Sequence, residues 1–82
     1  MMQIKTAGRL TMILGRQQAQ TGERITLRHL AEIADVPKDL VYRLDAGQAR
    51  YIDLHALARL CQALHCQLDD ILVWDDDGRQ PV

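Results

Sequence analysis

The chain has 82 residues, of which 48% are hydrophobic and 26% charged, and its net charge is −1. This composition is that of one ordinary globular domain, and it excludes a disordered chain or a histone-like polycation. One Trp, two Tyr and no Phe argue against an RNA-binding sheet of stacked aromatic rings. The chain has no apolar run of about 18 residues, so no membrane span is predicted.

Charge and cysteine usage add two expectations. Residues 1–59 carry a net positive charge and residues 60–82 a net negative one, which favours a part that faces a polyanion, followed by an acidic end. The first eight residues lack the apolar stretch of a secretory signal, so we expect a cytoplasmic protein. Cys61 and Cys66 are then expected to be free thiols in a reducing compartment.

The spacing of apolar residues predicts a string of helices and gives strands little support. Thr26 and Asp53 are suited to cap two of these helices, because each side chain can accept a hydrogen bond from a backbone amide of the first turn. Pro37 suits a first helical position, and Gly47 suits the left-handed residue that ends a helix. The predicted helices are Ile4–Gln20, Leu27–Ala34, Pro37–Asp45, Leu54–Leu64 and Leu68–Val73.

Each predicted helix has an apolar side that we expect to face a common core. The expected inward residues are, in chain order, Ala7, Leu10, Ile13, Leu14 and Gln17; Leu27, Leu30, Ala31 and Ala34; Leu40, Val41 and Leu44; Leu54, Leu57, Leu60, Cys61 and Leu64; Leu68, Ile71 and Leu72.

A short turn at Asp35-Val36 joins the second and third predicted helices, and such a tight link makes two helices cross steeply. The outer side of the third helix then projects from the domain, where it can enter the major groove of DNA. Tight helical turns also occur in all-α domains that bind no DNA. The outer positions of this helix are Lys38, Asp39, Tyr42, Arg43 and Ala46.

Two segments, Leu27–Gly47 and Ile52–Leu72, resemble the Cro/phage-repressor-type (XRE-like) helix-turn-helix family, and they do so in register. The first has Leu-Ala in its first helix, a small residue and Val at the turn, then aliphatic residues, an acid and Gly. The second resembles a compact bacterial branch of the family that ends in Asp-Ile-Leu. The similarity extends over about residues 9–73.

The resemblance implies an all-α, five-helix DNA-binding domain over residues 1–73, with a short acidic tail at 74–82. It also implies a transcriptional regulator that binds double-stranded DNA as a homodimer on two-fold operator sites. The residues that it assigns to base reading are Pro37, Lys38, Asp39, Tyr42 and Arg43. Those that it assigns to the DNA backbone are Thr26, Leu27, Arg28, Gln48 and Arg50.

Some positions depart from the family pattern. Leu27 stands where Gln often holds a phosphate, and Pro37 replaces a polar residue. Asp39 either accepts from a cytosine amino group or pairs with Lys38 or Arg43. The turn at Asp35 and the helix end at His65 both lack the usual Gly, and the link between the first two helices is longer than usual.

Other candidate sites carry less weight. Cys61, His65 and Cys66 lack the ligand spacing of a zinc site, so we expect neither metal nor cofactor. No constellation of residues supports an enzyme. Trp74 is either a dimer contact or a ring folded against the edge of the core. We therefore expect a dimeric DNA-binding repressor. The alternative is an antitoxin or adaptor that uses the same fold mainly to bind a partner protein.

Overall fold

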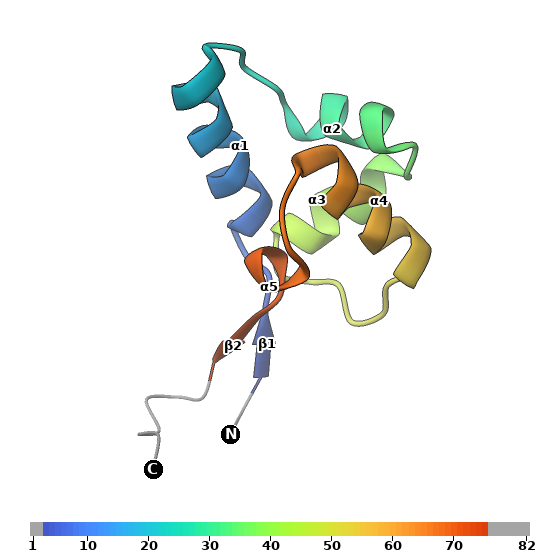
Figure 1. Cartoon of the computed structure of the whole chain (residues 1–82). Helices are drawn as coiled ribbons and strands as arrows, with labels where there is room; N and C mark the ends of the chain where they lie inside the picture. Colours follow the sequence, from blue (N-terminus) through green and yellow to red (C-terminus); the bar gives the residue numbers. More distant parts are fainter. Residues whose placement is uncertain (1–2, 76–82) are drawn as a thin grey trace.

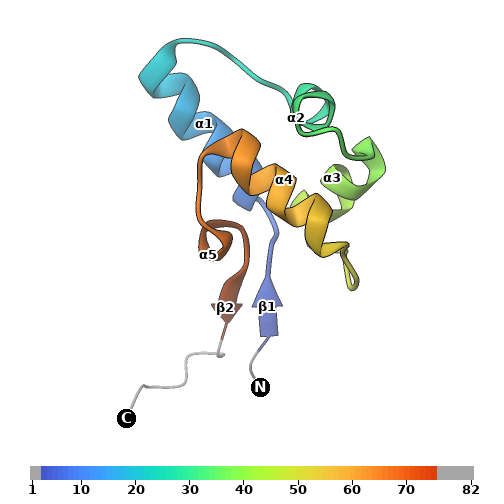
Figure 2. The same ribbon diagram turned by 45° about the vertical axis from the view of Figure 1, so that its right-hand side comes forward.

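The computed structural model describes residues 3–75, and it has the five helices expected from the sequence (Figure 1). Helix α2 packs against both α3 and α4, while α1 contacts α3 and α5. Figure 2 shows β1 and β2 side by side below the helices, on the side of α5 away from α2. The helices are α1 (Arg9–Thr21), α2 (Leu27–Ala34), α3 (Lys38–Asp45), α4 (Leu54–Leu64) and α5 (Leu68–Ile71).

Two short strands, which the apolar spacing does not predict, join the ends of the described chain. Strand β1 (Gln3–Lys5) pairs antiparallel with β2 (Val73–Asp75), with Ile4 opposite Trp74. Three residues are too few to show the alternation of a strand. The β2 strand includes Trp74 and Asp75, the first residues of the expected tail, and the other tail residues lie outside the described part.

Helix α1 begins five residues later than the predicted start at Ile4. Gly8 has a left-handed backbone (φ 73°) at the position before the helix, and this conformation ends any helix that would begin upstream. Its N–H donates to the Asp45 carbonyl at 2.7 Å. Ala7 therefore lies outside the helix and is exposed, contrary to prediction.

The other helix bounds agree closely with the predictions. Pro37 stands one position earlier than expected, at the extended N-cap of α3 (ψ 136°), so α3 begins at Lys38. Helix α5 ends at Ile71 instead of Val73, because Leu72 is extended (ψ 115°) and leads into β2. The predicted caps at Thr26 and Asp53 are confirmed, since each accepts from a backbone amide of its helix.

One apolar core joins the helices. It contains most of the predicted inward residues, among them Leu10, Leu44 and Leu60, each of which is almost completely buried. Leu54 and Leu68 were predicted inward but are 75% and 50% exposed. Both are the first residue of a helix, where the chain has not yet reached the core. No helix within residues 3–75 has the length and apolar character needed to cross a membrane.

Candidate nucleic-acid interface

The turn between α2 and α3 is three residues long and is held by backbone hydrogen bonds. Asp35 adopts the left-handed conformation (φ 57°), and its N–H donates to the Glu32 carbonyl at 3.2 Å. The next residue, Val36, donates to the Ala31 carbonyl at 3.0 Å and is buried. These two bonds form a Schellman motif. Pro37 is then extended and starts α3, so the turn fixes the angle between the two helices.

Helix α3 has a buried side and an exposed side. Val41 and Leu44 are buried in the core, and Leu40 packs partly against it. The opposite side is exposed and contains all four α3 residues that were predicted to read bases, as well as Ala46 just beyond the helix. These α3 residues are Lys38, Asp39, Tyr42 and Arg43. Pro37, the fifth predicted residue, is also exposed.

The charged groups on this side of α3 have no partners within the described chain. Lys38, Asp39 and Arg43 form no ion pair or side-chain hydrogen bond with any of residues 3–75. One of the two roles considered for Asp39, a pair with Lys38 or Arg43, is therefore absent from this structure. The cationic groups remain available for an anionic ligand.

The residues predicted to contact the DNA backbone lie at two places that flank α3. At the start of α2, the Thr26 hydroxyl accepts from the His29 N–H at 3.1 Å. Arg28 is exposed there, whereas Leu27 is half-buried and packs against the core. Gln48 and Arg50 are exposed in the link that follows α3.

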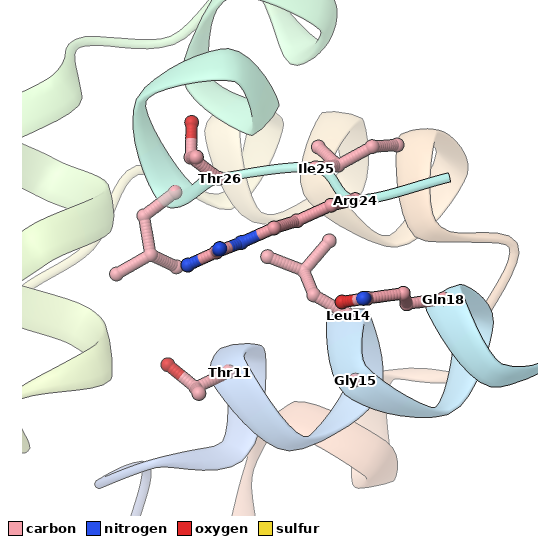
Figure 3. A pocket seen from close by; sticks show the side chains of 8 residues that line it. Thr11, Leu14, Gly15, Gln18, Arg24, Ile25 and Thr26 are labelled. Atoms are coloured by element: carbon pink, nitrogen blue, oxygen red, sulfur yellow. The ribbon is translucent and has the colours of Figure 1, made fainter. Parts of the chain in front are cut away.

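A pocket of about 380 Å³ separates the start of α2 from α1. Figure 3 shows the Arg24 side chain extending along this pocket, between Thr26 above it and Leu14 below. Arg24 belongs to the long link between α1 and α2, and it brings an exposed cation to the pocket beside the start of α2. Arg24 is not among the residues predicted from the sequence, because nothing in the local pattern distinguishes it from any other arginine in a loop.

The side chain of Asp45, at the end of α3, caps the start of α1. The Thr11 N–H donates to Asp45 Oδ1 at 3.1 Å, and Thr11 Oγ1 donates to Oδ2 at 2.6 Å. Nearby, the buried Thr6 hydroxyl donates to the Leu44 carbonyl at 2.6 Å. Gly8 offers no side chain to cap α1, so Asp45 supplies this cap from another element. Sequence spacing gives no signal for bonds between residues 34 positions apart.

Gly47 allows α3 to end close to the segment that precedes α1. Its φ is 76°, as expected for a left-handed cap, and a Cβ at this position would lie 3.0 Å from the Ala7 Cβ. Gln48 then donates to the Arg43 carbonyl at 2.9 Å. The glycine is needed both for its backbone conformation and for the close approach.

The remaining candidate residues lie away from α3. Trp74 is 68% exposed in β2, so its ring is not folded into the core. Cys61 and Cys66 are free, half-buried thiols. Within residues 3–75, no three His, Cys, Asp or Glu side chains are grouped closely enough to hold a metal ion.

Comparison with known proteins identifies the class of this helix pair. Residues 22–77 match the family model of the Cro/C1-type HTH DNA-binding domain. The match covers α2 to β2, while α1 lies before it. No curated protein and no solved structure matches the chain. Domains of this family bind double-stranded DNA and are typically not enzymes. The exposed side of α3 and the matched segment lead to one conclusion: this chain belongs to the Cro/C1-type family of helix-turn-helix DNA-binding domains.

Proposed function

We propose that this protein is a cytoplasmic, sequence-specific repressor that binds two-fold DNA sites as a homodimer. The observation that supports this proposal is the exposed side of α3, on which Lys38 and Arg43 have no partner within residues 3–75. A dimer would place two such helices in successive major grooves about one helical turn apart. It would repress by occupying a site that the transcription machinery also needs.

The side chains on α3 have distinct proposed roles. Arg43 and Lys38 donate to guanine acceptors, and Tyr42 contacts a thymine methyl group or a phosphate. Asp39 accepts from a cytosine amino group. Its carboxylate is available for this role, since it has no ion-pair partner in the described chain. Pro37 donates no hydrogen bond, and we propose that it packs against a base edge at the start of α3.

The flanking residues hold the DNA backbone. The backbone amides of Leu27 and Arg28 lie in the first turn of α2, where phosphates bind well to the positive end of a helix. Thr26 orders this turn through its bond to His29. Arg28, Gln48 and Arg50 add side chains that reach phosphates on either side of α3.

The operator is found by selecting bound oligonucleotides from a random pool. The proposal predicts a consensus with two-fold symmetry and half-sites about one helical turn apart. An asymmetric consensus, or no enrichment at low salt, would contradict it. Co-purification of a small partner protein, together with a lack of enriched sites, would instead favour the antitoxin or adaptor.

Substitutions on α3 test the base-reading roles. We expect Lys38→Ala and Arg43→Ala each to weaken operator binding by about 1–3 kcal/mol for every hydrogen-bonded base that the side chain no longer reads, and to relax the consensus at one position. Arg28→Ala should weaken binding to all sequences alike, because it removes a phosphate contact. Arg16→Ala on α1 is the matched control, and it should bind like the wild type. Gel shifts measure all four variants, and normal binding by both α3 variants would refute the assignment.

A further inference from the structure

Cys61 and Cys66 occupy the two positions of a helix end whose side chains meet. Helix α4 ends in a Schellman motif, in which the Cys66 N–H donates to the Cys61 carbonyl at 3.0 Å and the His65 N–H donates to the Gln62 carbonyl at 3.3 Å. His65, which precedes Cys66, is left-handed (φ 52°). In this motif the residue after the left-handed position commonly packs against the residue five places before it, and here both residues are cysteines.

The two thiols are in contact with each other. They are hydrogen-bonded through their sulfur atoms, and both side chains are half-buried against the core. A backbone hydrogen bond between two residues also keeps their Cα atoms near the separation of about 5.5 Å that a disulfide spans. The helix end therefore already holds the two sulfur atoms where a bridge between them can form.

We propose that Cys61 and Cys66 are a reversible redox site, which small disulfides such as oxidised glutathione convert to an intramolecular disulfide. The chemistry is two thiol–disulfide exchanges. One protein thiolate attacks a glutathione sulfur, releases the first glutathione as a thiol and forms a mixed disulfide. The neighbouring thiolate then attacks the protein sulfur of the mixed disulfide, closes the bridge and releases the second glutathione. Two protein thiols are oxidised, one glutathione disulfide is reduced, and the two cysteine protons end on the glutathione thiols.

The environment of the pair makes the exchange slow in both directions. Burial raises the pKa of both thiols, that of Cys66 to about 11, and the charge of Asp70 acts in the same direction. Little thiolate is therefore present at neutral pH to begin the oxidation. Each cysteine is also a poor leaving group when a reductant attacks the bridge. The pair therefore responds to a sustained change in the thiol–disulfide balance, and it stays reduced where that balance is reducing.

The bridge would tie the end of α4 to the start of α5. Helix α5 has only four residues. It is held by the buried Ile71 and by Arg9 Nε, which donates to the Asp70 carbonyl at 2.8 Å. A covalent link at this junction restricts the unfolded chain and so stabilises the folded one. Neither cysteine belongs to α2 or α3, so the inference does not rest on the proposed function.

Equilibration of the full chain with mixtures of oxidised and reduced glutathione tests the inference. Mildly alkaline buffer supplies enough thiolate for the exchange to reach equilibrium, and mass spectrometry of acid-quenched samples distinguishes the bridge from the mixed disulfide. The matched reference is the same chain in strong urea, where the thiols are separated by the same four residues without the motif. We expect the bridge to be favoured about tenfold or more in the folded chain over the unfolded one, which corresponds to about 1.4 kcal/mol. By linkage, the oxidised protein should need more urea to unfold.

Single substitutions identify the two sulfur atoms. Cys61→Ser and Cys66→Ser each retain one thiol, and we expect each to stop at the mixed disulfide with glutathione. Circular dichroism verifies that both variants keep their helices. A folded wild type that forms no intramolecular bridge would overturn the inference, as would a bridge that is no more favoured in the folded chain than in urea. Disulfide-linked pairs of chains as the main product would also overturn it.

Discussion

Asp35 and His65 are the residues other than glycine whose backbones are left-handed within residues 3–75, with φ of 57° and 52°. Each ends a helix, and each is followed by a residue that returns a hydrogen bond to the last turn. After α4, the Cys66 N–H donates to the Cys61 carbonyl at 3.0 Å. This Schellman motif brings the residue after the turn back beside the helix, which places the two thiols next to each other.

Because the Cys61 and Cys66 thiols lie side by side and partly buried, we predict that the free energy of unfolding falls at alkaline pH. Burial, followed by the charge of Cys61, raises the pKa of the Cys66 thiol from its ordinary 9.0 to about 11. Burial likewise raises the pKa of Cys61. Because the folded state holds these protons more tightly than the unfolded state, their contribution to stability is complete below pH 9 and is lost as the pH rises towards 11.

Urea unfolding between pH 8 and 11 measures this effect. We expect the free energy of unfolding of the wild type to fall more steeply with pH than that of Cys66→Ala. This variant lacks the Cys66 thiol and retains all the other titrating groups. Identical slopes would show that the thiols do not contribute. At neutral pH, both thiols should react slowly with alkylating reagents, because little thiolate is present.

At the scale of the elements, the sequence predicts what is determined locally. The bounds of α2, α3 and α4 agree within one residue, because caps such as Thr26 and Asp53 act within a single turn. The strands were missed because β1 and β2 lie at opposite ends of the chain and are ordered only by pairing with each other. Apolar spacing identified the inward side of α4 but could not show that Leu54 lies beyond the core.

In the candidate site, too, the features set by local periodicity could be predicted and the contacts between distant elements could not. The exposed positions of α3 follow from helical periodicity once Val41 and Leu44 are known to be inside. The cap that Asp45 provides for α1 could not be predicted, because it depends on how two distant helices meet. Its carboxylate appeared in the sequence only as the acidic residue of a family pattern.

Asp45→Ala tests the weight of this contact between elements. It removes the hydrogen bonds to the Thr11 amide and hydroxyl, and we expect the free energy of unfolding to fall by about 1–2 kcal/mol. Glu32→Ala is the control, since Glu32 is exposed and its side chain has no partner in residues 3–75. Chemical denaturation measures both variants, and equal stability of Asp45→Ala and the wild type would contradict the assigned cap.

At the scale of the whole molecule, the net charge of −1 contrasts with the local cations around α3. A chain with little net charge gains no general attraction to a polyanion. We therefore propose that binding to DNA comes from a few well-placed groups, among them Arg28, Lys38, Arg43 and Arg50. This arrangement favours selective sites over indiscriminate association with nucleic acid.

The salt dependence of operator affinity measures this distribution. The logarithm of the binding constant should fall linearly with the logarithm of the salt concentration, with a slope of about −0.9 for each phosphate neutralised. Arg28→Ala should reduce the magnitude of the slope by about 1. Arg16→Ala should leave it unchanged, and a slope near zero for the wild type would contradict binding through phosphates.

The hydrogen bonds from Thr11 to the Asp45 carboxylate bear on how the DNA specificity of such a protein could change by substitution. These hydrogen bonds hold the C-terminal end of α3, and the buried Val41 and Leu44 hold the side that faces the core. Neither contact uses the exposed residues of the helix. On the base-reading roles that we propose, substitutions at Lys38, Asp39, Tyr42 and Arg43 would alter the preferred DNA sequence while the orientation of the helix is preserved. Retargeting to a new promoter would require exchange of only this outer set, and the scaffold beneath it would carry over unaltered.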